Sequence, residues 1–134
     1  MILKEKKFKK YSVIIEDDEN YITIKIVANN INSDEIGSIS FKFNYQNRSV
    51  WIYKIEIKKE FQSQEFGDML IEIFEAYCQG KRFFQIEGKF YPENDHAKPF
   101  YEKHGYQIDK EYYDTFISKN IEMKNEILQK DFSF

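Results

Sequence analysis

The sequence contains few of the residues on which several protein classes depend: one cysteine, two prolines and five glycines in 134 residues. A single cysteine, Cys78, excludes an intrachain disulfide and a zinc site built from several thiolates. The scarcity of proline and glycine excludes a low-complexity chain. No stretch approaches the roughly 18 consecutive apolar residues of a membrane helix, and no apolar signal segment follows the first residues. We therefore expect a soluble, cytoplasmic protein.

An excess of charge is also missing, since the formal net charge is -3. That balance gives no overall field for nucleic acid, and lysines gather only in residues 4–10, which we interpret as a solvated leader strand or tail. Nucleic-acid binding through these lysines is an alternative with a steep salt dependence. The two histidines, His96 and His104, are expected at the surface, and no metal site is expected because no cysteine or carboxylate joins them at ligand spacing.

Aromatic residues, in contrast, are abundant, with thirteen Phe and ten Tyr. A chain of this length suits one domain, residues 1–134, and buries about two thirds of its unfolded surface. We therefore expect a single core built from large rings.

Residues 50–80 predict a strand followed by a helix. The strand segment, residues 50–58, alternates with a period of two, and apolar residues between Phe66 and Tyr77 recur at helical spacing. One strand face is predicted to contain Trp51, Tyr53, Ile55 and Ile57. The connecting turn brings the free N–H groups of a helix start to the end of a strand, where they can hold an anion. Alternatively, this is an ordinary strand-to-helix crossover in which Gly67 serves close packing.

The remaining segments predict an α+β fold with a mixed sheet, in the order β-β-β-β-α-β-α-β-β. Further strands are predicted at residues 11–16, 21–28, 36–45, 82–90, 106–108 and 113–119. A short helix is expected from His96 or Ala97 to His104, since Pro99 fits a first helical turn. Residues 120–134 are a tail or a further short helix. The first four strands are expected to be antiparallel, and the helix allows strand 82–90 to lie parallel to the central strand.

The segment from Asn94 to Tyr106 resembles the second signature of the GCN5-related N-acetyltransferase (GNAT) family, Asn-x-x-Ala-x-x-(aromatic)-Tyr-Glu-Lys-x-Gly-(Phe/Tyr). The loop at residues 62–67 lies where that family keeps a pyrophosphate loop, Gln/Arg-x-x-Gly-x-Gly/Ala. The resemblance covers residues 36–119 and implies a GNAT-like fold and transfer of an acetyl group from acetyl-CoA to an amine of a small molecule or a protein.

The resemblance also implies roles for individual residues. Backbone groups around Ile55 and Ile57 would pair with the pantetheine arm, and the helix start would receive the diphosphate. Tyr101 matches the general acid, a phenol near its unperturbed pKa that can donate to the leaving sulfur; a ring of the core is the alternative. Glu56 is a candidate base, directly or through water, or else simply a solvated residue. The expected cofactor-binding set is Ile55, Ile57, Gln62, Gln64, Glu65, Phe66, Gly67, Asp68, Asn94, Ala97 and Tyr101.

Two departures from the family pattern concern the site. Glu65 stands where the family has a glycine and Gln62 where arginine is frequent, while Asp68 adds a second acid to the helix start. The turn at residues 17–20 leaves no room for the helices that the family usually places between its first two strands. The acceptor side is therefore expected to be open, or completed by a second copy in a homodimer. An alternative is an inactive interaction module of the same fold that binds a protein partner.

Overall fold

The computed structural model describes residues 1–91, 94, 96–111 and 114–121. It contains one eight-stranded sheet in the order β1-β2-β3-β4-β5-β6-β8-β7. The elements are β1 (Ile2–Lys7), β2 (Tyr11–Asp17), β3 (Ile22–Ala28), β4 (Glu35–Asn44), β5 (Ser49–Ile57), the 3-10 helix η1 (Lys59–Phe61), α1 (Phe66–Gly80), β6 (Gln85–Phe90), α2 (Ala97–Lys103), β7 (Gln107–Glu111) and β8 (Asp114–Asn120). The predicted fold class and the order of elements from β2 onward are confirmed, whereas the possible C-terminal helix falls outside the described residues after residue 121.

The sheet combines an antiparallel meander with one crossover. Strands β1 to β5 pair antiparallel in sequence order, α1 carries the chain back, and β6 pairs parallel with β5. The lysine-rich leader, interpreted above as a solvated strand or tail, is the edge strand β1 and its turn to β2, closed by a hydrogen bond from Phe8 N to Tyr11 O of 2.8 Å. The turn between β2 and β3 has no helix, as expected.

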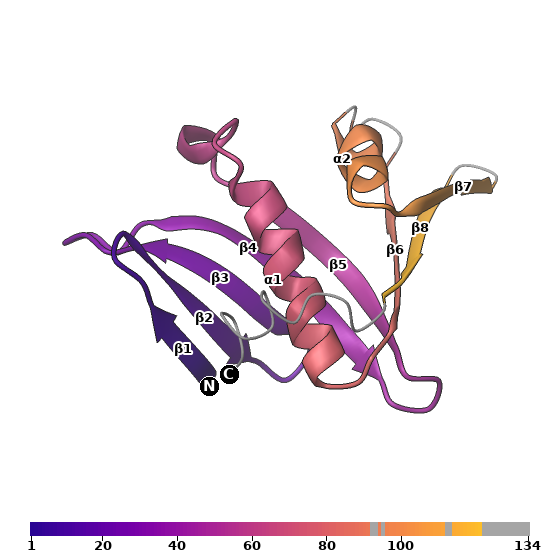
Figure 1. Ribbon diagram of the computed structural model, residues 1–134, viewed down its shortest axis with the longest axis horizontal. Helices are drawn as coiled ribbons and strands as arrows, with labels where there is room; N and C mark the ends of the chain where they lie inside the picture. Colours follow the sequence, from indigo (N-terminus) through magenta and orange to yellow (C-terminus); the bar gives the residue numbers. More distant parts are fainter. Residues whose placement is uncertain (92–93, 95, 112–113, 122–134) are drawn as a thin grey trace.

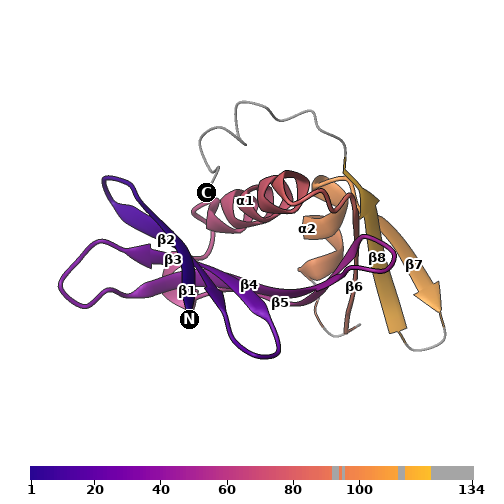
Figure 2. The ribbon, with the colours of Figure 1, turned by 90° about the horizontal axis from the view of Figure 1, so that it is seen from below.

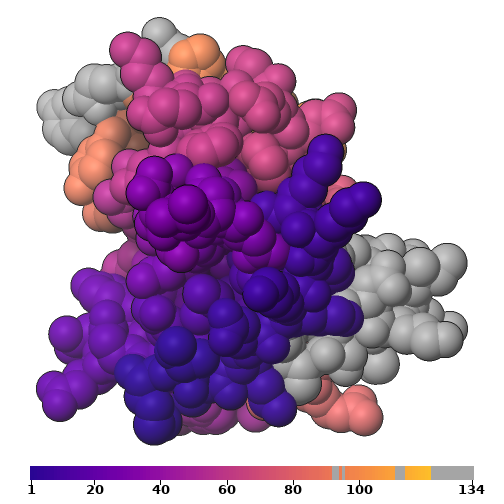
Figure 3. All heavy atoms as spheres, turned by 90° about the vertical axis from the view of Figure 1, so that its left-hand side faces the viewer, coloured from indigo at the N-terminus to yellow at the C-terminus, as the bar shows by residue number. Residues whose placement is uncertain are grey.

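Both helices lie on the same side of the sheet (Figure 2). The core lies between this side and α1, where Phe41 of β4 meets Phe74 of α1 edge to face at 4.8 Å between ring centroids. The opposite side of β1–β5, which we call the outer face, is polar, as in the pair of Lys25 with Glu16 at 2.8 Å. Figure 3 views the molecule from the β1 side, with the N-terminal strands below the pink segment of η1 and α1. Among the described helices, none has the length and hydropathy of a membrane span.

A β-bulge in β5 corrects the predicted faces of this strand. Ser40 pairs with Lys54 but Phe41 pairs with Ile52, so Tyr53 is an extra residue. The alternation therefore changes at Tyr53, and the predicted common face of Trp51, Tyr53, Ile55 and Ile57 is wrong. Ile55 and Ile57 lie on the α1 side, whereas Trp51 and Tyr53 lie on the outer face.

Candidate functional site

The site begins where β5 and β6 separate. The parallel ladder joins Ser49–Ile52 to residues 85–88 and ends there, although β5 continues to Ile57 and β6 to Phe90. Beyond the ladder the two strands diverge, with α1 and α2 beside the opening (Figure 1). Among the described residues, no strand pairs with the second half of β5 on this edge. Apart from the Ile57 oxygen, which accepts a hydrogen bond from Gln62 Nε2, its backbone groups on this edge are therefore available to an extended ligand that pairs as a strand would.

The start of α1 lies just beyond the end of β5. The preceding loop contains Ser63 and Glu65, both with φ of 66°, in the left-handed region that costs a non-glycine residue about 1 kcal/mol. Glu65 is the N-cap of α1, and no described side chain caps the first turn. The free N–H groups of this turn form a position where an anion is favoured.

The side chains of the two glutamines in this loop donate hydrogen bonds to nearby backbone oxygens. Gln62 Nε2 donates to Ile57 O at 3.1 Å, and Gln64 Nε2 donates to Glu60 O at 3.2 Å. Their side-chain amides thus fix the path of the backbone from β5 to α1.

Gly67 lies where three elements meet. A Cβ on this residue would lie 3.3 Å from Phe100 Cε1 of α2 and 3.8 Å from Ile57 Cγ1 of β5. The glycine therefore allows α1 to start close to both elements, which agrees with the packing role considered for it. Phe66, its neighbour, meets the ring of Phe61 edge to face at 6.1 Å.

Asp68 points toward α2. Its Oδ2 lies 2.8 Å from Lys103 Nζ and its Oδ1 lies 2.6 Å from His104 Nε2. The pKa of the Asp68 carboxyl lies below its usual value. The hydrogen bond from Lys103 is the largest cause, burial acts in the opposite sense, and the hydrogen bond with His104 lowers the pKa further. The expectation that His104 lies at the surface is wrong, since its side chain is only 11% exposed. Within the described part of the chain, no group of three potential ligands could hold a metal ion.

Tyr101 lies in α2 on the other side of the opening. It is 4% exposed, stacks on Phe90 at 6.0 Å and meets Tyr106 edge to face at 5.3 Å. Burial raises the pKa of Tyr101 to about 12, so the expectation of an unperturbed phenol is wrong, although the phenol still holds its proton at neutral pH.

The hydroxyls of the two neighbouring tyrosines differ. Tyr106 Oη donates to Glu75 Oε2 at 2.8 Å, whereas Tyr101 Oη has no hydrogen-bond partner among the described residues. Every fully buried side-chain nitrogen or oxygen of the described residues has a hydrogen-bond partner. The Tyr101 oxygen, which has none, is therefore not fully buried. Tyr101 can therefore donate a hydrogen bond to a ligand.

Asn94 and Ala97 lie at the start of α2. Asn94 is exposed, and its Oδ1 accepts a hydrogen bond from His96 N at 3.3 Å. Its backbone oxygen accepts from Ala97 N at 3.2 Å, and Ala97 is buried. These contacts organise the turn into α2, and Asn94 Nδ2 has no hydrogen-bond partner among the described residues.

Glu56 lies on the outer face between two lysines. Its carboxylate is 3.1 Å from Lys54 Nζ and 3.9 Å from Lys58 Nζ. The hydrogen bond from Lys54 and the charges of both lysines lower the pKa of Glu56. A carboxylate so stabilised in its charged form is a weak base, which favours the solvated alternative.

Sequence reasoning did not identify an aromatic pair on the outer face. Tyr21 and Tyr53 meet edge to face at 4.6 Å, and they are 37% and 48% exposed. Tyr53 is the bulge residue and directly follows the last pair of the β5–β6 ladder. The pair therefore lies at the opening, on the side away from α1. The two tyrosines are visible in the sequence, but the bulge that brings their rings together is not.

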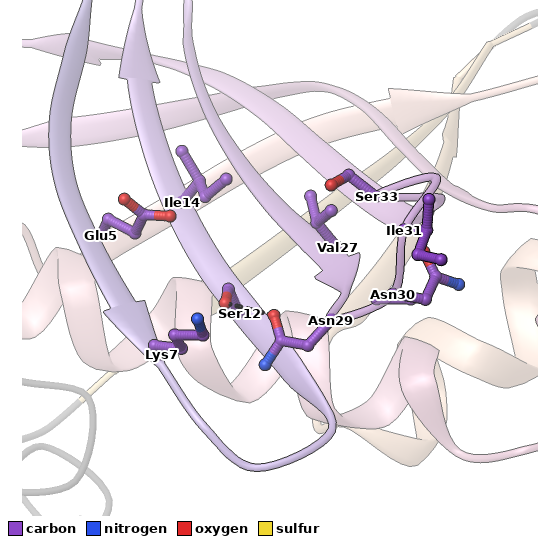
Figure 4. A pocket seen from close by; sticks show the side chains of 10 residues that line it. Glu5, Lys7, Ser12, Ile14, Val27, Asn29, Asn30, Ile31 and Ser33 are labelled. Carbon is purple, nitrogen blue, oxygen red and sulfur yellow. Dashed lines mark hydrogen bonds between the residues drawn. The ribbon is translucent and has the colours of Figure 1, made fainter.

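A hollow of about 640 Å³ lies elsewhere on the outer face, over β1–β3 and the loop that follows β3 (Figure 4). Within it, Ser12 Oγ donates to Asn29 Oδ1 at 2.7 Å. It lies at the opposite end of β3 from Tyr21 and contains none of the predicted site residues. The convergence of β5, α1 and α2, where the predicted site residues lie, is therefore a better candidate than this hollow.

The chain is similar to known proteins in sequence and in structure. Residues 12–108 match the family model of the acetyltransferase (GNAT) domain. The chain is similar in structure to the PaiA N-acetyltransferase of Thermoplasma acidophilum in complex with coenzyme A, with 19% identity and a TM-score of 0.65 over 74% of this chain and 60% of that chain.

Two further solved structures are similar. The ribosomal-protein-S18-alanine N-acetyltransferase from Escherichia coli has 17% identity and a TM-score of 0.65, over 82% of this chain and 75% of that chain. The spermidine N-acetyltransferase SpeG from Vibrio cholerae, an F149G mutant, has 21% identity and a TM-score of 0.64, over 77% of this chain and 66% of that chain. No curated protein sequence matches the chain.

Proposed function

Because the chain belongs to the GNAT family of acetyltransferases, we propose that it transfers the acetyl group of acetyl-CoA to an amine of a small molecule or a protein. The observation that carries this proposal is the open edge of β5, which runs between the uncapped start of α1 and α2, the helix of Tyr101. An anion, a strand-like arm and a hydrogen-bond acceptor can be held in that order by this arrangement.

The residues present fit such a cosubstrate. The backbone of Ile55 and Ile57 would pair with the amide-rich arm, and the N–H groups of Phe66, Gly67 and Asp68 would hold the diphosphate. Gln62 and Gln64 keep the loop in place for it. Glu65 at the start of α1, and Asn94 and Ala97 at the start of α2, would lie beside the bound cosubstrate.

Acetyl-CoA supplies a thioester whose carbonyl carbon accepts the amine and whose sulfur leaves as a thiolate. Tyr101 would donate a hydrogen bond to that sulfur, and its pKa of about 12 keeps the proton in place for this donation. A thiol has an ordinary pKa of about 8.5, so the phenol stabilises the thiolate by hydrogen bonding more readily than by complete proton transfer. The amine must arrive unprotonated, and Glu56 could assist only as a weak base through water.

Isothermal titration of the wild-type protein with acetyl-CoA and CoA tests this proposal. We expect saturable binding at submillimolar cosubstrate, and thiol release when an amine acceptor from a panel of small amines and amine-bearing peptides is added. Absence of binding heat at these concentrations would contradict the proposed function.

The acceptor would approach from the outer face. The short turn between β2 and β3 leaves this face uncovered by helices, and the Tyr21–Tyr53 pair lies there beside the opening. Two of the similar structures are named for acceptors of very different size, spermidine and an alanine of a ribosomal protein. An open acceptor side is compatible with either.

We expect Tyr53→Ala to raise the KM for the amine by about tenfold while leaving the Kd for acetyl-CoA unchanged, because truncating a half-exposed ring removes contact area on the acceptor side alone. Steady-state kinetics and titration calorimetry measure the two constants. Tyr45→Ala, which truncates another exposed ring on the β4–β5 turn, is the control. A Tyr53→Ala enzyme with an unchanged KM would remove Tyr53 from the acceptor surface.

Substitutions of Glu65 distinguish the proposed enzyme from the alternative, an interaction module without catalysis. We expect Glu65→Gly to stabilise the fold by about 1 kcal/mol, since glycine adopts a φ of 66° without strain, and to lower the Kd for CoA by about fivefold. Thermal unfolding and calorimetry measure the two effects.

Two matched variants separate strain from charge. Ser63→Gly, at the same φ of 66°, should raise stability alone, whereas Glu65→Gln should improve binding alone. CoA affinity that responds to neither Glu65 variant would favour an abandoned cofactor site.

A further inference from the structure

The beginning of α1 carries more negative charge than a diphosphate site favours. Residues 60–68 contain Glu60, Glu65 and Asp68 and no lysine or arginine. Of the two lysines that precede this segment, Lys59 is exposed in η1, and Lys58 lies near carboxylates of the outer face, 3.5 Å from Glu35 and 3.9 Å from Glu56. The partial positive charge of a helix start attracts an anion, but nearby carboxylates oppose it. A cation from another element would offset them.

The end of α2 places a cation at this position. Lys103 Nζ lies 2.8 Å from Asp68 Oδ2, and His104 Nε2 lies 2.6 Å from Asp68 Oδ1. Both carboxylate oxygens of Asp68 are therefore engaged by α2, in the first turn of α1. The ion pair therefore places the Lys103 ammonium beside a side chain of that turn.

Lys103 has donors to spare. Its side chain is 64% exposed, and an ammonium group has three hydrogen-bond donors, of which Asp68 takes one. The Asp68 carboxylate raises the pKa of Lys103, and the charges of Glu65 and Glu72 raise it further. The ammonium is thus within electrostatic reach of Glu65, the N-cap residue of α1.

We propose that Lys103 is a cofactor-binding residue whose ammonium, paired with Asp68 in this structure, contacts the diphosphate of CoA at the start of α1. This inference rests on the proposed function. Lys103 would provide, from α2, the positive charge that the loop lacks at Gln62, and it would compensate for Glu65.

Isothermal titration of Lys103→Met with CoA and with dephospho-CoA tests the assignment. We expect the Kd to rise by about tenfold for both ligands, because a charge-assisted contact to the diphosphate is lost and the carboxylates of α1 are left without compensation. The loss should shrink as salt is added. Lys103→Arg should keep the Kd within about twofold of the wild type, since it keeps the charge.

Two matched variants serve as controls. Lys98→Met removes an exposed charge from the same helix and should leave the Kd unchanged. Asp68→Asn removes a carboxylate but leaves Lys103, and it should bind CoA at least as tightly as the wild type. Thermal unfolding of each variant verifies that it is folded.

Three results would overturn the inference. The first is a Kd of Lys103→Met for CoA equal to that of the wild type. The second is a loss of affinity for CoA but not for dephospho-CoA, which would place Lys103 on the ribose phosphate. The third is a loss of affinity in Asp68→Asn as large as that in Lys103→Met. If the wild type binds CoA, such results leave the proposed function intact. A wild-type protein that binds no CoA would overturn both.

Discussion

Replacing Tyr101 with phenylalanine is expected to lower kcat for acetyl transfer by about a hundredfold and to leave the Kd for acetyl-CoA nearly unchanged. The reason is that the substitution removes only the hydroxyl. The ring contacts with Phe90 and Tyr106 remain, and the hydroxyl has no partner among the described residues, so the fold loses little. Single-turnover kinetics with an amine acceptor, combined with calorimetry, separates the two constants.

Tyr106→Phe is the matched control for Tyr101→Phe. Its hydroxyl belongs to a buried hydrogen bond with Glu75, so its loss should lower stability with a much smaller effect on kcat. A Tyr101→Phe enzyme with unchanged kcat would remove Tyr101 from the proton-donor role. Equal losses of kcat in both variants would indicate disturbed packing of the two rings instead.

Replacing Glu75 with alanine is expected to destabilise the protein by about 2 kcal/mol, since it leaves the buried Tyr106 hydroxyl without its acceptor and removes one partner of a partly buried ion pair. Glu75 is 7% exposed, and it accepts hydrogen bonds from Tyr106 Oη and Lys119 Nζ, each at 2.8 Å. Lys119 also donates to His104 O at the end of α2. The free energy of unfolding, measured by urea titration, tests this expectation.

Glu72→Ala is the appropriate comparison, because Glu72 is exposed on the same helix. Its loss should change stability by about 0.5 kcal/mol or less. If Glu75→Ala costs no more than Glu72→Ala, the buried network does not anchor α1 to β8 and α2.

The architecture was predictable because local patterns in this chain agree with its sheet and helices. Alternation in residues 22–28 and the helical spacing from Phe66 to Tyr77 correspond to β3 and α1. The leader strand β1 was harder to recognise from the sequence, because it lies at the edge of the sheet and four of its residues are charged. Edge strands are commonly charged in this way, which makes them similar in sequence to a solvated tail.

The site was predictable only in part, because its details depend on contacts between distant segments. The signature at Asn94–Tyr106 indicated α2 and Tyr101, but the bulge at Tyr53 depends on the pairing of β5 with β4. The ion pair of Asp68 with Lys103 joins residues 35 positions apart. That pair offsets the negative charge that Asp68 adds to the helix start, whereas Glu65, with its strained backbone, keeps an exposed carboxylate there.

The most direct measurement is a crystal structure of the protein with CoA bound. We expect the diphosphate on the N–H groups of the first turn of α1, the pantetheine arm paired with β5 beyond Tyr53, and the sulfur within hydrogen-bonding distance of Tyr101 Oη. CoA bound at another surface, or a sulfur remote from Tyr101 with the diphosphate position taken by the protein's own carboxylates, would contradict this expectation.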